Sequence, residues 1–542
     1  MLSSLFLLSL IASSSLADSL LVNDEPVIMN DEVLKPVILN DEPVILNEEP
    51  KVVYDEPVMV DDEPVILNDQ PEIVNDEPVL VDDEPVILND EPVILNDEVN
   101  KDDVESIEKE MSREVEEEFS DKEHQDELSL LKKQFASAHS DNETYISIPT
   151  ELDINTNHTE LFEGDIDLSP EQWKVALDSD PKNPLRRRQA LSSVTSMWQP
   201  MGAPVIPYTF QPGFPAQYQQ VVRDAIAFWE QRTCAKFRLA TPSDASAIVF
   251  NHNANGCSSS VGRRNQRQQL NLQAPGCMTV TIVAHELSHA FGTLHVQSRV
   301  DRDTYVQIDT TNIQKGMEHN FRMEPTGYST YGLPYEFGSM QHYFPYAFAV
   351  NQQRPTIYAR PAYQRFQGSM DGPRATFWDT VLINKMYKCT DKCPRQMACQ
   401  NGGVTDGANC NKCFCPRGWT GTNCERRPSD AQTTNVAASA QTVKVEMTGV
   451  FSAFQEKLVV LQAPAGKRIE ATVKSFGPYR FSMCRSVGLE IVPTTDTRTS
   501  GLRFCAQPNP STPIVSDGNT MLLWLYRDAN YPVTAEVSVR AV

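Results

Sequence analysis

Five residues in one short stretch have the types and the spacing of a metal site. His285 and His289 are four residues apart, so in a helix both imidazoles lie on one face and can reach the same ion. Glu286 flanks them with a carboxylate that can move a proton. His295 lies six residues beyond His289 and cannot face that ion from the same straight helix. Gly292 removes this obstacle, because glycine can take a left-handed conformation that ends the helix and turns the chain back.

The chemistry that this pattern favours is that of zinc. A catalytic zinc ion takes three protein ligands, with bonds to nitrogen of about 2.0–2.1 Å, and keeps one position open. A His-Glu-x-x-His pattern alone is also compatible with the charged face of an ordinary helix. Because Gly292 and His295 follow at the required spacing, we expect a zinc site, built by a helix with two histidines and a turn that presents the third.

Charge and cysteine content divide the 542-residue chain into two parts. Residues 1–188 carry 13 basic and 49 acidic side chains, whereas residues 189–542 carry 34 basic and 24 acidic ones. All 12 cysteines lie at or after Cys234, and their even number and spacing predict disulfides and an oxidising compartment. Neither part has the charge of a nucleic-acid-binding protein.

The first residues have the pattern of an export signal. Residues 2–12 are apolar and Ser15-Leu16-Ala17 offers small residues for cleavage, so residues 1–17 are predicted to be a signal peptide. A buried helix or an anchor is the alternative. No later run reaches the roughly 18 apolar residues that span a bilayer, and we therefore expect a secreted, extracellular protein without a membrane span.

Two patterns follow the signal. Residues 22–99 repeat variants of Asn-Asp-Glu-Pro-Val-Ile-Leu, mostly every seven residues. Proline at this spacing excludes a coiled coil, and repulsion between the acidic residues predicts an extended, disordered segment, either a spacer or a weak binding segment. In residues 103–138, apolar residues at helical spacing predict one or two solvated helices; they are Ile107, Met111, Val115, Leu128, Leu131 and Phe135.

The acidic part ends in a candidate processing site. Arg186-Arg187-Arg188 lies in a proline-containing link, and in a secreted chain such a triplet is typical of cleavage by a basic-specific convertase. An ordinary charged loop is the alternative. Asn142 and Asn157 are in glycosylation sequons. Together with the charge asymmetry, this predicts a propeptide over residues 18–188 that is removed after Arg188.

The histidine stretch, followed by Arg299-Val300-Asp301-Arg302-Asp303, resembles the astacin family of zinc metalloendopeptidases, a branch of the metzincins. The resemblance covers about residues 190–389, and we place the catalytic domain at 189–389. It implies an α+β fold of two subdomains around a zinc cleft, with a mixed sheet and the zinc helix above and irregular structure below. It further implies that His285, His289 and His295 bind one zinc ion and that Glu286 is the general base.

A second stretch is similar to the Met-turn of the family. Gly338-Ser339-Met340-Gln341-His342-Tyr343 implies that Tyr343 is a further zinc ligand that stabilises the transition state. The chain departs from the family pattern in that Gln341 occupies the usual methionine position. It also has Val296 after the third histidine, where the family usually has a glutamate that meets the new N-terminus. Neither change removes a ligand or the base, so we expect activity to be retained.

Phe162-Glu163-Gly164-Asp165 resembles the aspartate switch of astacin zymogens, 23 residues before Arg188. The resemblance implies that Asp165 binds the zinc ion in the latent form in place of water and blocks the enzyme. A plain turn is the alternative for the tetrapeptide alone. The propeptide is thus expected to inhibit its own enzyme.

The family resemblance also implies how the cysteines pair. In the catalytic domain it pairs Cys234 with Cys389 and Cys257 with Cys277. Residues 390–425 resemble an EGF-like module, which implies the pairs Cys393–Cys410, Cys399–Cys413 and Cys415–Cys424, although these six cysteines alone allow 15 pairings and a zinc cluster competes. After a linker at 428–442, residues 443–542 show short β-rich runs and, with Cys484 and Cys505, resemble an all-β CUB sandwich.

These features predict a secreted zinc endopeptidase made as a zymogen. The arrangement resembles that of nematode astacins involved in moulting, hatching or cuticle collagen processing, which implies matrix, cuticle or eggshell proteins as substrates. The alternative is an extracellular binding protein that acts through the EGF-like and CUB-like modules, and Val296 and Gln341 are its support. The sequence does not specify an oligomeric state.

Overall fold

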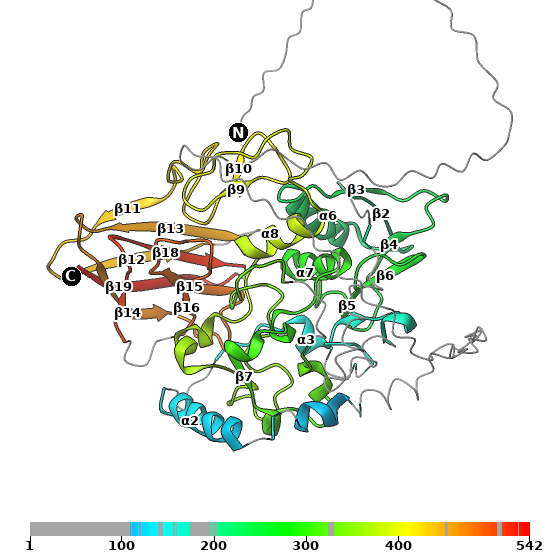
Figure 1. Cartoon of the computed structure of the whole chain (residues 1–542), viewed down its shortest axis with the longest axis horizontal. Helices are drawn as coiled ribbons and strands as arrows, with labels where there is room; N and C mark the ends of the chain where they lie inside the picture. Colours follow the sequence, from blue (N-terminus) through cyan, green and yellow to red (C-terminus); the bar gives the residue numbers. More distant parts are fainter. Residues whose placement is uncertain are drawn as a thin grey trace, which may run out of the picture. The chain divides into compact units, whose positions relative to one another are not determined.

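The computed structural model describes residues 109, 111–117, 119–120, 122–138, 145–155, 158, 160–173, 197–198, 203–323, 330–449, 454–506, 512–528 and 530–542. The predicted signal peptide, the acidic repeats of 22–99, Asn142, Asn157 and the basic triplet ending at Arg188 lie outside the described residues. Figure 1 shows the arrangement of the helices and strands.

A six-stranded sheet forms the frame of the predicted catalytic domain, in the order β1-β5-β6-β4-β2-β3. Strands β3, β2, β4 and β6 run parallel, β5 is antiparallel to β6, and β1 pairs in parallel with β5 at the edge. This is the mixed sheet that the resemblance implies. The strands are β1 (Ile166–Asp167), β2 (Val205–Phe210), β3 (Lys236–Leu239), β4 (Ala247–Asn251), β5 (Cys257–Ser260) and β6 (Arg267–Leu272).

Two helices pack together beside this sheet, α6 (Ala216–Glu230) and α7 (Val280–Phe291). Buried residues of α6 recur at helical spacing and end in Trp229, which is fully buried. The indole Nε1 of Trp229 donates a hydrogen bond of 2.9 Å to the carbonyl oxygen of Ala284 in α7. The core of this subdomain therefore fixes the position of the helix that carries the first two histidines.

The residues after α7 have little regular structure, as the resemblance implies. A short antiparallel pair, β7 (Val306–Ile308) and β8 (Ile357–Ala359), and the final helix α8 (Phe377–Met386) are its main elements. The 3-10 helices are η2 (Val296–Ser298), η3 (Arg302–Thr304), η4 (Thr310–Asn312), η5 (Glu318–Phe321) and η6 (Pro361–Ser369). A second apolar core, which includes Phe321, Phe344 and Ile357, supports this subdomain.

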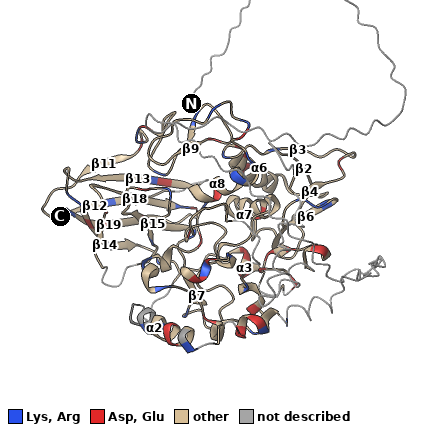
Figure 2. Cartoon of the chain, viewed as in Figure 1, with Lys and Arg blue, Asp and Glu red and all other residues tan. Residues whose placement is uncertain are grey.

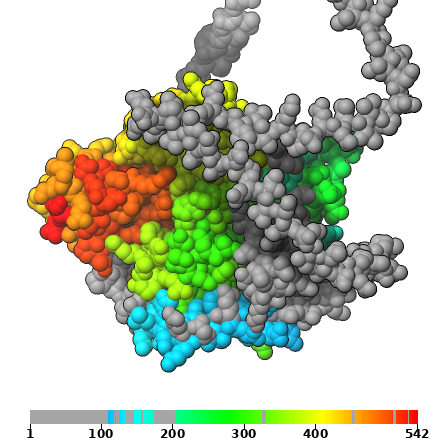
Figure 3. All heavy atoms as spheres, viewed as in Figure 1, coloured from blue at the N-terminus to red at the C-terminus, as the bar shows by residue number. Residues whose placement is uncertain are grey.

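Helical residues 111–117 and helix α2 (Lys122–Ala138) lie against the lower subdomain. The amide of Gln307 donates to the carbonyl oxygen of His124 at 2.6 Å, and Lys132 pairs with Asp309 at 2.7 Å. The predicted apolar stripe is buried here, in Met111, Val115, Leu128 and Leu131. The expectation of solvated helices is wrong for this face, because the stripe packs on the catalytic domain. Figure 2 marks the charged residues along α2 by colour on the cartoon, and Figure 3 shows the helix at the surface.

Residues 145–155 and 160–173, called the front segment below, continue this contact. They include α3 (Glu151–Ile154) and β1. Thr150 forms a capping box with Asp153, which starts α3. Apolar residues of the segment are buried against the catalytic domain, among them Leu152, Phe162 and Ile166.

The compact module at 390–425 is held by its cysteines more than by secondary structure. Its one strand pair is β9 (Val404–Thr405) with β10 (Cys413–Phe414). Three disulfides link Cys393 to Cys410, Cys399 to Cys413 and Cys415 to Cys424. These partners are the ones that the resemblance implies.

Residues 432–542 form two stacked sheets, called the C-terminal sandwich below. One sheet has the order β11-β13-β18-β15-β16 and the other β12-β19-β14-β17. Strand β11 lies in the stretch predicted to be a linker, where two threonines favour an extended strand that pairs with β13. The strands are β11 (Gln432–Asn435), β12 (Gln441–Met447), β13 (Gln455–Gln462), β14 (Ile469–Gly477), β15 (Val487–Val492), β16 (Leu502–Phe504), β17 (Ile514–Val515), β18 (Thr520–Arg527) and β19 (Val533–Ala541).

The sandwich contacts the catalytic domain through buried polar groups. Arg503 pairs with Glu490 at 2.8 Å inside the sandwich, and its Nη2 donates to the carbonyl oxygen of Gly338 at 3.3 Å. The backbone N–H of Ser500 donates to Glu336 at 3.1 Å.

Among the described residues, no helix is both long and apolar enough to cross a bilayer.

Candidate metal centre

The three histidines are presented by α7 and by the turn that follows it. The side chain of Thr279 accepts a hydrogen bond from the backbone N–H of Ile282 and caps the start of the helix. Gly292 ends the helix with φ of 112°, in the left-handed region. The predicted helix and the predicted turn at Gly292 are therefore confirmed, and the turn returns His295 to the face of His285 and His289.

Each imidazole is held by a hydrogen bond at its outer nitrogen. The Nδ1 of His285 donates to the Met340 carbonyl at 2.7 Å, and that of His289 donates to the Thr293 carbonyl at 2.8 Å. The Nδ1 of His295 contacts the Glu163 carboxylate at 2.7 Å. Since carbonyl and carboxylate oxygens accept, Nδ1 is the donor in each case, and the inner Nε2 is the nitrogen that can bind a metal.

Asp165 completes the cluster from the front segment. Its carboxylate oxygens lie 3.2 Å from Nε2 of His285, 3.6 Å from that of His289 and 3.4 Å from that of His295. A tetrahedral zinc ion with bonds of about 2.0–2.1 Å needs ligand atoms about 3.3 Å apart. All four residues are buried, and their ligand atoms fit one zinc ion in both type and spacing.

The tetrapeptide that carries Asp165 is shaped by its neighbours. Phe162 is buried in an apolar cluster, and Glu163 has φ of 46° while its carboxylate contacts His295. Gly164 has φ of 76°, and a Cβ there would lie 2.6 Å from the ring of Phe348. A glycine is therefore required for the turn that places Asp165 among the histidines.

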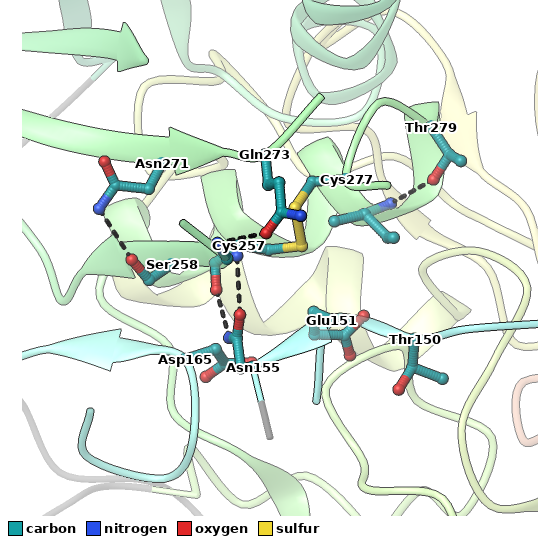
Figure 4. The surroundings of a disulfide bond; sticks show 12 residues. Thr150, Glu151, Asn155, Asp165, Cys257, Ser258, Asn271, Gln273, Cys277 and Thr279 are labelled. Carbon is teal, nitrogen blue, oxygen red and sulfur yellow. Dashed lines mark hydrogen bonds between the residues drawn. A yellow bond between two sulfur atoms is a disulfide. The ribbon is translucent and has the colours of Figure 1, made fainter. Parts of the chain in front are cut away.

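Asn155 ties this turn to the catalytic domain, as Figure 4 shows. Its side-chain Nδ2 donates to the carbonyl of Cys257 at 2.6 Å and to that of Gly164 at 2.9 Å. Its Oδ1 accepts from the N–H of Cys257 at 2.8 Å. The disulfide between Cys257 and Cys277 joins strand β5 to the residues just before α7. No local pattern in the sequence indicates Asn155, because its contact on β5 is 102 residues away.

Glu286 lies on α7 next to His285 and is fully buried. No described residue donates a hydrogen bond to either of its carboxylate oxygens. Burial, together with the charges of Asp165 and Glu151, raises the pKa of Glu286 well above its usual value. The carboxylate is thus free of protein hydrogen bonds beside the histidine cluster.

Tyr343 lies beside the histidines but outside the four-residue cluster. Its hydroxyl donates a hydrogen bond of 2.6 Å to the carbonyl oxygen of Glu163, and its ring centre is 4.8 Å from that of His295. Burial raises the pKa of Tyr343 well above its usual value, so the hydroxyl keeps its proton and donates. The resemblance assigns this hydroxyl as a zinc ligand. In this structure it is hydrogen-bonded to the front segment instead.

The two departures from the family pattern are accommodated by packing. Met340 is buried in the core that contains α7, and its carbonyl oxygen orients His285. Gln341 donates from Nε2 to the His285 carbonyl at 3.2 Å, and its own carbonyl accepts from the N–H of Val296 at 2.8 Å. The turn therefore still contacts the first histidine and the residue that follows the third.

Comparison with known proteins agrees with this geometry. The model of the astacin family (peptidase family M12A) matches residues 191–388. The zinc metalloproteinase dpy-31 of Haemonchus contortus is 34% identical over 396 residues, which are 70% of this chain and 71% of that protein. The chain belongs to the astacin family. The region matched by the family model holds the three histidines, Glu286 and Tyr343, whereas Asp165 of this astacin lies before it.

Other members of the family match less of their own length. The zinc metalloproteinase nas-38 of Caenorhabditis elegans is 32% identical over 385 residues, which are 69% of this astacin chain and 51% of the relative. The chain thus spans about half the length of nas-38. Among solved structures, the hatching enzyme zinc-protease high choriolytic enzyme 1 of the medaka fish Oryzias latipes has 30% identity and a TM-score of 0.33, covering 35% of this chain and 94% of its own.

Proposed function

We propose that this astacin is a secreted zinc metalloendopeptidase that is made as a zymogen. The observation that carries the proposal is the convergence of three Nε2 atoms beside a buried carboxylate to which no described residue donates a hydrogen bond. Three imidazoles form the donor set of a catalytic zinc site, and the neighbouring Glu286 provides the base that hydrolysis requires.

Each residue of the site has a separate role in peptide hydrolysis. A bound zinc ion lowers the pKa of water to about 7 and polarises a carbonyl group. Glu286 takes the proton of the attacking water on its carboxylate and passes it to the leaving amine. The hydroxyl of Tyr343 donates to the oxygen that becomes negative when the scissile carbonyl is attacked.

The front segment is proposed to keep the enzyme latent as part of a propeptide over residues 18–188. Asp165 supplies a carboxylate at the position that the attacking water needs, and the Glu163 carbonyl engages the hydroxyl of Tyr343. Cleavage after Arg188 and departure of the segment would free both groups. The burial of Asp165 supports this role, because no solvent competes for its contacts.

The alternative, an extracellular binding protein without activity, rests on Val296 and Gln341. The hydrogen bonds of Gln341 and the burial of Met340 favour the enzyme, because both hold the first histidine in place. The modules at 390–425 and 432–542, proposed to be EGF-like and CUB-like, would then serve recognition. The three disulfides of the first of these modules support a secreted protein.

The proposal is tested by a Glu286→Gln variant of the processed enzyme. Glutamine keeps the shape of the side chain but cannot take a proton, so we expect peptide hydrolysis to fall by about 10²–10⁴-fold while one zinc ion per chain stays bound. Glu230→Gln, at the end of α6 in the same subdomain, is the matched control and should keep wild-type activity. Equal turnover by the Glu286→Gln variant and the wild type would refute the assignment.

As substrates we propose extracellular matrix, cuticle or eggshell proteins. The support is the predicted export of the chain and its modular C-terminal part. Mass spectrometry of peptides released from a matrix extract by the processed enzyme, with the Glu286→Gln variant as blank, would identify the cleaved proteins. Absence of enzyme-dependent peptides from such an extract would argue against this substrate class.

A further inference from the structure

The front segment binds the C-terminal sandwich as well as the catalytic domain. The N–H of Ile146 donates to the carbonyl of Arg480 at 2.8 Å, and the N–H of Ser482 donates to the carbonyl of Ile146 at 3.1 Å. These bonds form a parallel β-bridge between Ile146 and Phe481. The carbonyl oxygen of residue 480 can therefore accept a hydrogen bond from an extended chain, and the N–H of residue 482 can donate one to it.

Five residues further on, the front segment places a carboxylate on an arginine of the sandwich. Arg485 Nη1 lies 2.7 Å from Glu151 of the front segment and 3.5 Å from Asp371 of the catalytic domain. All three side chains are at most 8% exposed. Arg485 directly follows Cys484, whose disulfide to Cys505 fixes the backbone at this point.

Removal of the front segment would leave this arrangement incomplete. Arg485 would keep the more distant carboxylate of Asp371 and lose the closer one of Glu151. A guanidinium group in a protected site favours a carboxylate partner, which it can hold with two parallel hydrogen bonds. The backbone groups at 480 and 482 would lose their partner at the same time.

The front segment links this arginine to the metal centre. Its Glu151 lies 2.7 Å from Nη1 of Arg485, and its Asp165 lies 3.2 Å from Nε2 of His285. The same front segment runs from Glu151 to Asp165 within 14 residues. A single extended polypeptide can therefore contact both Arg485 and the catalytic residues.

We propose that in the processed enzyme Arg485 and the backbone of residues 480–482 form a secondary substrate site, which binds an extended segment of the protein substrate through an aspartate or glutamate. This inference rests on the proposed protease function. It makes the C-terminal sandwich a part of the substrate-binding surface. The front segment occupies that site in the zymogen with Ile146 and Glu151.

The test varies the position of a single glutamate in a peptide substrate. A peptide from the matrix digest is resynthesised with every acidic residue changed to glutamine, and one glutamate is then placed at each position in turn. For the processed wild type we expect kcat/KM to rise about tenfold at one or two adjacent positions, mainly through KM, since a charge-assisted contact is lost when glutamine replaces glutamate. This rise should shrink as salt is increased.

The ratio between the glutamate and the glutamine peptide is the decisive readout, because it does not depend on the amount of active enzyme. Arg485→Gln should bring the ratio close to one, and Arg485→Lys, which keeps the charge, should give an intermediate ratio. Arg540→Gln, an exposed arginine of the same sandwich paired with Glu470, should keep the wild-type ratio and activity.

Two results would overturn the inference. One is a flat ratio at every position in the wild type, which decides the matter even if the Arg485 variants do not fold. The other is an unchanged glutamate preference in Arg485→Gln. If the wild type cleaved none of the peptides, the proposed protease function itself would fail, and that outcome is distinct from both.

Discussion

The metal centre is built from two regions that are held in different ways. His285, His289 and His295 come from eleven consecutive residues, which the core around Trp229, a capping threonine and a left-handed glycine hold in place. Asp165 comes from a segment 120 residues earlier that contacts the site across strand edges and side-chain hydrogen bonds. The first region belongs to the catalytic core, whereas the second joins its surface.

In the proposed activation, the first region stays in the enzyme and the second leaves with the propeptide. The histidines keep their orientation through carbonyl oxygens of Met340 and Thr293, within the catalytic domain. The contacts of Asp165 and Glu163 with the cluster cross from the front segment and would end with its departure. Only His295 takes its outer hydrogen bond from the front segment, so it is the ligand whose surroundings change most on activation.

Asp165→Asn in the unprocessed chain has the largest expected effect and tests the role of the second region. The amide keeps the size of the side chain but loses its charge, and charge-assisted contacts contribute about 1.5–3 kcal/mol. We expect peptidase activity without cleavage at Arg188 to rise roughly ten- to hundredfold. Asp167→Asn, two residues on and paired with Arg264 at 3.1 Å, is the control and should stay latent. Equal latency of both variants would contradict a role for Asp165.

Asn155→Ala tests how the second region is attached. The change removes three hydrogen bonds and leaves the buried N–H of Cys257 without its partner, which costs about 1–3 kcal/mol. We expect the free energy of unfolding of the zymogen to fall by that amount, with no change in the processed enzyme. Asn271→Ala removes two partly buried side-chain hydrogen bonds, one to Ser258 that Figure 4 shows and one from Asn251, and should have a smaller effect. An unchanged free energy of unfolding of the zymogen would contradict this attachment.

Gly292→Ala tests the first region and has the smallest expected effect. An alanine in the left-handed region costs about 1–2 kcal/mol. Gly316→Ala is a matched control, because Gly316 has φ of 88° and space for a Cβ. We expect similar losses of unfolding free energy for both, but a lower zinc affinity only for Gly292→Ala, since that turn presents His295. Equal zinc affinities in a competition titration would show that the turn does not position the ligand.

The sequence predicts the first region well because its information is local. The spacing of the histidines specifies one helix face, and Gly292 specifies the turn, so helix, cap and ligand set follow from adjacent residues. The partners of ten of the twelve cysteines are those that the resemblance implies. Local spacing is enough for the helix and the histidine set, whereas the cysteine partners depend on the family resemblance.

The second region was predictable only in part. The resemblance of Phe162–Asp165 indicates Asp165, but Asn155 and the role of Glu163 depend on residues more than 100 positions away. The same holds for Arg485 and Glu151, whose sequence separation hides their ion pair. Helical spacing in residues 103–138 correctly indicates helices, but it cannot show that their apolar stripe is buried against the catalytic domain.

The most direct test of the account is X-ray absorption at the zinc edge, with metal analysis, on the purified unprocessed chain. We expect one zinc ion per chain, bound by three imidazole nitrogens and a carboxylate oxygen, and loss of the carboxylate in the Asp165→Asn variant. A chain that binds no zinc, or one that binds it with fewer than three imidazoles, would contradict the account.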